Sequence, residues 1–113
     1  MNNHLIDIRQ LLILTILDQQ DASIEALSTT IQDCSGGIIK TAWGRLFPDM
    51  LQLEMNEWIK KQPRDSHGSM PYTITDEGRQ AYAAMLKAWK DYTTALGNIH
   101  TTLTMRRQTE QTA

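Results

Sequence analysis

The chain has 113 residues, the size of one domain with a modest core, and carries 13 acidic against 11 basic side chains, a net charge of −2. Hydrophobic residues make up 41% and charged residues 21%, and no apolar run approaches the length needed to cross a bilayer, which excludes a membrane-spanning protein. The charges are unevenly spread: residues 1–37 carry five acidic and one basic side chain, and residues 38–113 carry eight acidic and ten basic. A locally positive surface is therefore compatible with the acidic total.

The apolar segment Leu11–Leu17 is predicted to be a buried helix rather than a signal peptide. Asp7 and Arg9 precede it, and no small-residue cleavage site follows it. Cys34 is the single cysteine and has no partner for an internal disulfide, which fits a reducing compartment. We therefore expect a cytoplasmic protein that does not bind a membrane.

Two helices are predicted before residue 35. The first begins near Leu5 and is apolar nearly all round, so it should be central or shared between subunits. Ser23 is a good N-cap for the second, which should end near Cys34. Gly36 and Gly37 then permit a left-handed backbone, so a loop should follow through residue 41.

A third helix is predicted to begin near residues 44–47, with Pro48 inside its first turn. A proline is tolerated there because the N–H groups of the first turn have no acceptor within the helix. Apolar side chains recur at three- and four-residue steps on one face, which should be buried while the other is presented. The apolar positions are Leu46, Met50, Leu53 and Trp58, with Leu51 beside them.

A short hairpin is expected after this helix. Residues 60–71 are polar and contain two prolines, as a loop or hairpin tip does. Residues 72–75 alternate and are rich in β-branched or aromatic side chains, which is typical of a strand, and residues 58–60 would pair with them. The arrangement predicts a wing.

A long helix follows, capped by Thr75, with Asp76 and Glu77 in the first turn, where the helix dipole favours negative charge. Its apolar residues alternate steps of three and four, as in a coiled-coil seam, so a second copy of the chain is the expected partner. The predicted dimerisation residues, with one from the first helix, are Leu12, Tyr82, Met85, Trp89, Tyr92, Leu96, Ile99 and Leu103.

This order of elements is that of a winged helix-turn-helix, and two motifs resemble those of the PadR-like transcriptional regulators. The first motif is Arg45-Leu46-Phe47-Pro48, then Met50-Leu51-Gln52-Leu53-Glu54 and Trp58-Ile59; the second is Tyr72-Thr73-Ile74-Thr75-Asp76-Glu77-Gly78-Arg79. We expect a mostly α fold with a small two-stranded β wing. Its expected parts are a winged helix-turn-helix domain (1–75), a dimerisation helix (76–105) and a flexible tail (106–113).

Three features depart from the family pattern. Arg45 replaces a threonine, Glu57 stands where a glycine normally ends the recognition helix, and residues 66–70 lack the usual wing cations. Contacts from the wing should therefore be weaker. Asp49 and Glu57 are also expected to reduce the positive field along the presented helix.

The resemblance implies a DNA-binding regulator that acts as a repressor. A homodimer would occupy a pseudo-palindromic operator, with the third helix in a major groove of each half-site. Arginine can bind guanine in two hydrogen bonds and lysine offers a point charge for phosphate. The candidate DNA contacts are Ser28, Gln32, Lys40, Thr41, Arg45, Lys60, Lys61 and Arg64. For each of them the alternative is a solvated surface side chain.

Other functions are weighed against this one. The acidic balance and cation-poor wing leave open a winged-helix protein that binds another protein, as an antagonist or adaptor. Some members of the family bind flat aromatic effectors between subunits, so Trp89 is a candidate contact for a planar aromatic ligand, although such residues more often pack in a core or interface. His4, His67 and His100 are too scattered for a metal site. No cofactor is implied, and no catalytic arrangement indicates an enzyme.

Overall fold

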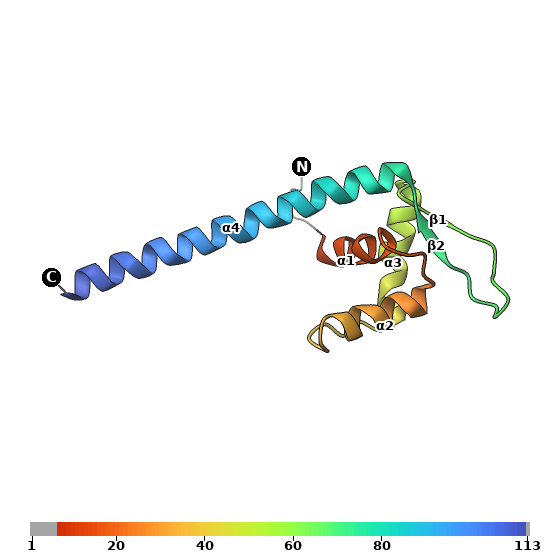
Figure 1. Cartoon of the computed structure of the whole chain (residues 1–113), viewed down its shortest axis with the longest axis horizontal. Helices are drawn as coiled ribbons and strands as arrows, with labels where there is room; N and C mark the ends of the chain where they lie inside the picture. The colour runs from red at the N-terminus through yellow and green to blue at the C-terminus, as the bar shows by residue number, and fades with distance from the viewer. Residues whose placement is uncertain (1–6, 113) are drawn as a thin grey trace.

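The computed structural model describes residues 7–112 and contains four helices and a two-stranded antiparallel sheet (Figure 1). The elements in chain order are α1 (Ile8–Leu17), α2 (Ile24–Cys34), α3 (Trp43–Met55), β1 (Ile59–Lys61), β2 (Tyr72–Ile74) and α4 (Asp76–Thr112). This confirms the predicted winged helix-turn-helix with a long C-terminal helix. The predicted start of the first helix at Leu5 lies outside the described residues.

The core is built where α1, α2 and α3 pack on one another and on the sheet. Each helix contributes apolar side chains at helical spacing, and the strands contribute alternate positions, as their periodicities require. The buried apolar residues are Leu11, Ile13, Leu14, Leu17, Ala22, Ile24, Leu27, Ile31, Leu46, Met50, Leu53, Ile59, Tyr72 and Ile74. We call this part of the molecule, residues 7–75, the body.

The N-terminal helices form largely as their sequences predict. Asp7 accepts a hydrogen bond from the backbone N–H of Gln10 and begins α1, and Ser23 accepts one from Ala26 and begins α2. Gly36 and Gly37 both adopt positive φ, at 68° and 80°, beyond the end of α2. The two glycines therefore provide the left-handed turn that leads the chain towards α3.

The start of α3 differs from the prediction. The helix begins at Trp43, so Pro48 is its sixth residue and lies in the second turn. The missing N–H of Pro48 leaves the Gly44 carbonyl without its usual helical donor. The N-cap, Ala42, makes no side-chain hydrogen bond, so no capping residue marks this boundary.

The end of α3 corrects two further expectations. Trp58 lies beyond the C-cap Asn56, outside the helix, and Leu51 is exposed rather than part of the buried face. Glu57 adopts a φ of 63°, and the Trp58 N–H donates to the Leu53 carbonyl at 3.0 Å, the pattern of a helix that ends in a left-handed residue. Glu57 therefore takes the conformation that a glycine would adopt more readily.

The wing forms between the two expected segments, with β1 beginning one residue later than the expected strand at residues 58–60. Ile59 pairs with Ile74, Lys60 with Thr73 and Lys61 with Tyr72. The backbone of Tyr72 also exchanges two hydrogen bonds with that of Ala22, at 3.2 and 2.8 Å, so the wing is tied to the segment between α1 and α2.

Three residues of the second motif fix the start of α4 against the body. Thr75 Oγ1 accepts from the Gly78 N–H at 3.0 Å and donates to the Glu57 carbonyl at 2.7 Å. A Cβ at Gly78 would lie 2.1 Å from the Trp58 carbonyl oxygen, so only glycine fits this close approach. Arg79 bonds to the Asp18 carboxylate at 2.8 Å and fixes the first turn of α4 against the end of α1.

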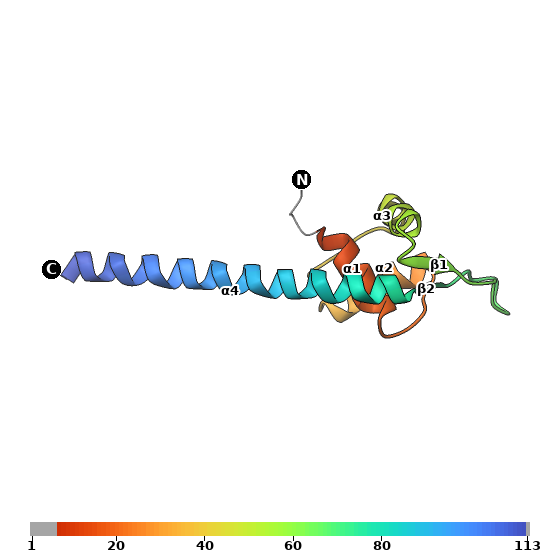
Figure 2. The ribbon, with the colours of Figure 1, turned by 90° about the horizontal axis from the view of Figure 1, so that it is seen from above.

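The long helix α4 extends well beyond the body (Figures 1 and 2). Its 37 residues correspond to about 55 Å at 1.5 Å per residue. Residues 106–112 continue the helix and contain no glycine or proline to stop it. The flexibility expected for residues 106–113 stays a prediction. Among residues 7–112, no helix has both the length and the apolar character needed to cross a membrane.

The predicted dimerisation residues divide into two groups along the molecule. Leu12, Tyr82 and Met85 are half-buried and pack against the core of their own chain. The others remain exposed on α4; we call Trp89, Tyr92, Leu96, Ile99 and Leu103 the α4 row. The α4 row therefore has no cover within residues 7–112.

Candidate nucleic-acid interface

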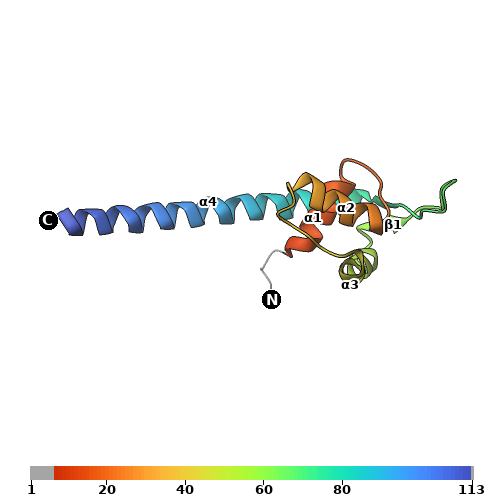
Figure 3. The same ribbon diagram turned by 90° about the horizontal axis from the view of Figure 1, so that it is seen from below.

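Helix α3 presents one face to solvent. Figures 2 and 3 show it at the outer edge of the body, to one side of α1, α2 and α4. Leu46, Met50 and Leu53 point inward and are buried, which matches the predicted inner face. The opposite face is free to meet a partner.

The charge on α3 differs from the expectation because Asp49 points inward. Its carboxylate is buried and accepts a hydrogen bond from Arg9 Nε on α1 at 2.8 Å. Burial raises the pKa of Asp49, and the nearby Arg9 guanidinium opposes that rise. Asp49 therefore pins α3 to α1 and does not place its charge on the presented face. Glu57 is exposed, as expected.

The candidate DNA contacts before and within α3 gather at its N-terminal end. Lys40 and Arg45 are exposed, and Thr41 is half-buried between them in the chain. Ser28 on α2 donates its hydroxyl hydrogen to the Thr41 carbonyl at 2.5 Å. Ser28 thus holds the loop that carries Lys40 and Thr41. Gln32 is exposed on α2, and its backbone carbonyl accepts from the Gly37 N–H at 2.8 Å.

The wing cations do not all face α3. Lys60 and Lys61 are adjacent in β1, so their side chains leave opposite faces of the sheet. Lys61 borders a hollow that Phe47 and Leu51 of α3 also line, so it is the lysine on the α3 side. Arg64 donates to the Gly68 carbonyl at 2.8 Å and helps to close the wing tip.

The tip of the wing is an ordered turn. The Asp65 carboxylate accepts from the N–H groups of His67 and Ser69, at 2.8 and 3.0 Å. Gly68 adopts a φ of 81° between them. The tip is therefore closed by its own polar groups, with Arg64 engaged in the same turn.

An apolar row on the presented face of α3 was not identified from the sequence. Trp43, Phe47, Leu51 and Met55 follow one another at steps of four and are 48%, 50%, 58% and 68% exposed. We call these four residues the α3 row. The rings of Trp43 and Phe47 meet edge to face, with centroids 5.4 Å apart. The four-residue spacing is visible in the sequence, but the predicted helix begins near residues 44–47 and so does not include Trp43.

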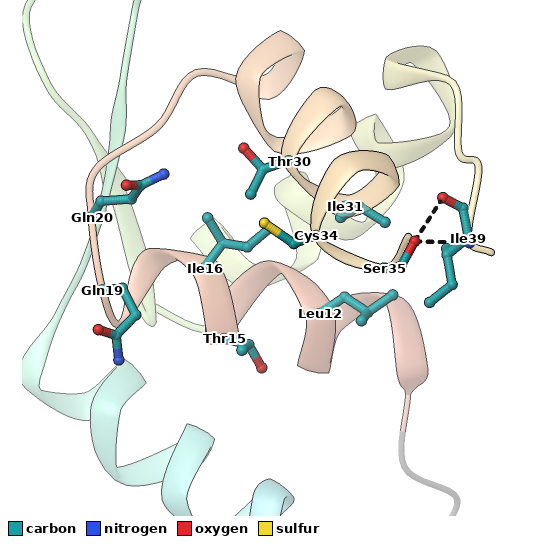
Figure 4. A pocket seen from close by; sticks show the side chains of 10 residues that line it. All are labelled: Leu12, Thr15, Ile16, Gln19, Gln20, Thr30, Ile31, Cys34, Ser35 and Ile39. Atoms are coloured by element: carbon teal, nitrogen blue, oxygen red, sulfur yellow. Dashed lines mark hydrogen bonds between the residues drawn. The ribbon is translucent and has the colours of Figure 1, made fainter. Parts of the chain in front are cut away.

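A cavity between α1 and α2 was also missed (Figure 4). Its volume is about 400 Å³, and its lining is mostly apolar. The lining residues are Leu12, Thr15, Ile16, Gln19, Gln20, Thr30, Ile31, Cys34, Ser35 and Ile39. Ser35 Oγ accepts from the Ile39 N–H at 3.0 Å, which fixes one wall of the cavity. The predicted ligand contact, Trp89, lies elsewhere, on α4, and stays a prediction.

No group of three His, Cys, Asp or Glu side chains in the described part of the chain is placed to hold a metal ion. The surface carries both signs of charge, because Glu54 lines the same hollow as Lys61 and Glu57 is exposed just beyond the end of α3. The candidate interface is thus a binding surface that combines Lys40 and Arg45 with the apolar α3 row and, on the wing side, Lys61.

Solved structures with this fold come from several bacteria. A transcriptional regulator from Clostridium thermocellum has a TM-score of 0.74 and 21% identity, with 80% of this chain and 87% of that chain covered. A PadR-like transcriptional regulator from Bacillus cereus has a TM-score of 0.70 and 22% identity, with 81% and 90% covered. Bacillus subtilis PadR in complex with operator DNA has a TM-score of 0.62 and 18% identity, with 71% and 48% covered.

The family follows from a comparison of the sequence with a family model. A comparison with curated proteins found no match. The model of the transcriptional regulator PadR-like family matches residues 13–84, which include α2, α3, the wing and the first turns of α4. That match spans more than half of the chain and includes both motifs on which the resemblance was based. The chain therefore belongs to the PadR-like family of transcriptional regulators.

Proposed function

We propose that this protein is a transcriptional repressor that binds double-stranded DNA as a homodimer on a pseudo-palindromic operator. The observation that carries the proposal is the open face of α3, with Lys40 and Arg45 at its N-terminal end and Asp49 turned inward. In a winged helix-turn-helix, the N-terminal part of this helix meets base edges in the major groove. The fold is shared with Bacillus subtilis PadR, whose structure was solved in complex with operator DNA.

Each cation has a distinct role in this proposal. Arg45, in the first turn of α3, would bind a guanine through O6 and N7, because its planar guanidinium can form two parallel hydrogen bonds. Lys40, in the preceding loop, and Lys61, on the wing, would contact phosphates. Ser28 would act indirectly, since its hydrogen bond to the Thr41 carbonyl holds the loop in place.

The homodimer is supported by exposed apolar surface on two parts of the chain. The α4 row is uncovered, and the cavity between α1 and α2 offers an apolar surface on the body that includes Leu12 and Ile16. Two copies related by a two-fold axis would each place α4 against the body of the other. Both surfaces would then be buried at once, and two α3 helices would address successive half-sites about 34 Å apart.

A titration of labelled duplex DNA at several salt concentrations tests the proposal. The duplex is first selected from a pool of random sequences by its binding to the protein. This selection also identifies the preferred operator sequence. Affinity should fall as salt rises. The slope of the logarithm of the binding constant against the logarithm of the salt concentration should be about −0.9 for each phosphate contact. Affinity that stays unmeasurable even at low salt would contradict the proposal.

Two variants separate the roles of the cations. Arg45→Ala should weaken binding by about 1–3 kcal/mol and relax the preference at one base pair. Lys40→Ala should weaken binding to all sequences and reduce the salt slope by about 1. Arg107→Ala, near the far end of α4 and outside the candidate DNA contacts, is the matched control and should leave affinity unchanged to within about twofold.

A second candidate function is the binding of another protein, which the wing favours. Its tip carries Arg64 as the only cation in residues 64–70, and that side chain is engaged with the Gly68 carbonyl. This candidate predicts a stoichiometric protein partner whose capture is unchanged in Arg45→Ala and Lys40→Ala. Loss of capture in both variants, together with specific DNA binding by the parent chain, would reject it.

A further inference from the structure

The α3 row is an apolar stripe that begins beside the buried face of α3 and becomes more exposed towards Met55. Its four side chains lie at steps of four, so they follow one line along the helix for about 18 Å. The core is filled by a separate set of α3 residues, Leu46, Met50 and Leu53. Trp43 and Phe47 are about half covered, partly by their contact with each other, but none of the four residues belongs to the buried core, so the core does not account for the apolar character of the whole row.

The surroundings of the α3 row favour DNA as its occupant. Lys40 and Arg45 are exposed at one end, and Lys61 borders the same hollow as Phe47 and Leu51 on the wing side. Glu54 is the one acidic side chain that lines this hollow, so the described cations around the row outnumber it. An apolar stripe flanked by cations is complementary to a major groove, whose floor carries bases and whose walls carry phosphates. The apolar group on that floor is the C5-methyl of thymine, which aromatic and aliphatic side chains recognise by contact.

We infer that Trp43, Phe47 and Leu51 read thymine C5-methyl groups, so that each half-site combines the guanine bound by Arg45 with neighbouring thymines. This inference rests on the proposed DNA binding. The helix enters the groove with its N-terminal part, so the first three members of the α3 row meet bases. Met55 is the last residue of α3, so we expect it to lie outside the groove.

The contribution of the methyl groups can be isolated by chemistry on the DNA. Deoxyuridine differs from thymidine only by the absence of the C5-methyl, so base pairing and charge are kept. In the selected duplex, each thymine of a half-site is replaced in turn, and affinity is measured by fluorescence anisotropy at one fixed salt concentration. Two or more positions should lose about fourfold in affinity each, the value for one buried methyl group.

Protein variants assign each methyl to a side chain. For each position we compare the affinity for the duplex with thymine to that for the duplex with deoxyuridine. In Leu51→Ala this ratio should fall to about one at one position and remain as in the parent at the other positions. Met55→Ala is the matched control, an exposed apolar residue of the same row, and should keep every ratio. Phe47→Leu keeps an apolar side chain and should change the ratio at a different position. Thermal unfolding of each variant checks that it folds.

Two outcomes overturn the inference and are distinguishable. If no duplex binds at low salt, the proposed DNA binding fails, and the inference fails with it. If a duplex binds specifically but every thymine can be replaced by deoxyuridine without loss, DNA binding stands and the α3 row does not read methyl groups. The second outcome, with affinity unchanged in the row variants, is the one expected if the row instead covers a protein partner.

Discussion

The body and the distal part of α4 differ in what covers their apolar side chains. In the body, Leu14, Leu27 and Leu53 are fully buried by the same chain. On α4, residues of similar size such as Leu96 and Leu103 are more than half exposed. The body therefore has its own core, whereas the distal part of α4 has an apolar stripe that residues 7–112 leave exposed.

The same contrast exists within α3. Its inner face belongs to the core, and Asp49 on that face is paired with Arg9. Its outer face carries the α3 row and Arg45, which the described part of the chain leaves largely exposed. Two uncovered apolar stripes on separate helices suggest two separate partners, a second copy for the α4 row and DNA for the α3 row.

The largest expected effect is on the free energy of unfolding, and it compares a residue of the body's core with a residue of the α4 row. Leu53→Ala should lower the free energy of unfolding by about 2–5 kcal/mol, because it removes a fully buried side chain and leaves a cavity. Leu103→Ala should have a smaller effect that grows with protein concentration, because it acts through assembly. Denaturant unfolding followed by tryptophan fluorescence at two concentrations measures both. Equal, concentration-independent losses would contradict the contrast.

The junction between the two parts is tested by a pair of glycines. Gly78→Ala would force a Cβ against the Trp58 carbonyl oxygen, so it should cost at least about 2 kcal/mol. Gly97→Ala places a Cβ where no atom lies within 4 Å, in the middle of a helix, and should stabilise the chain by about 0.5–1 kcal/mol. Thermal unfolding of the two variants should show shifts of opposite sign. If Gly78→Ala leaves the stability unchanged, the start of α4 does not pack as closely against the Trp58 carbonyl as the structure shows.

The smallest effect concerns the buried carboxylate of Asp49. Burial raises the pKa of Asp49 in the folded state above its ordinary value of 3.8. In the pH range just above 3.8, Asp49 is therefore still protonated in the folded protein but already ionised in the unfolded chain. The free energy of unfolding of the parent should therefore fall relative to Asp49→Asn as pH rises through this range, and then stay level. Near neutral pH the two should differ by less than about 1 kcal/mol, since Arg9 is half exposed.

A control for this titration lies on α4. Asp91 pairs with Lys87 in solvent at 2.7 Å, and its removal in Asp91→Asn should change stability by less than about 0.5 kcal/mol. Denaturant unfolding at a series of pH values measures both variants. A parent that gains stability over Asp49→Asn as pH rises above 3.8 would mean that the pairing with Arg9 outweighs burial.

The order of elements could be predicted because local signals mark most boundaries. Ser23 and Thr75 cap their helices with side-chain hydrogen bonds, and Gly36 and Gly37 end α2 with positive φ. The boundary without such a signal was misplaced: Ala42 makes no side-chain cap, so the helix start was sought at Pro48. The same misplacement left Trp43 outside the helix and concealed the α3 row.

Contacts between distant residues account for the other differences. Asp49 appears as one more acidic side chain in the sequence, because its partner Arg9 is 40 residues away. The glycine in the second motif is explained by a carbonyl 20 residues earlier, that of Trp58. Periodicity identifies which side chains lie on one face, but only packing shows which face is covered and by what.

The central claim is that two copies of this chain, joined through α4, place their α3 helices on one duplex. Sedimentation of the protein with the selected duplex measures it most directly, because the mass of the complex gives the number of 12.9 kDa chains bound to each duplex. The account predicts two chains for each duplex and, without DNA, a particle of twice the chain mass. A single chain on the duplex, or a monomer at concentrations where DNA is bound specifically, would contradict it.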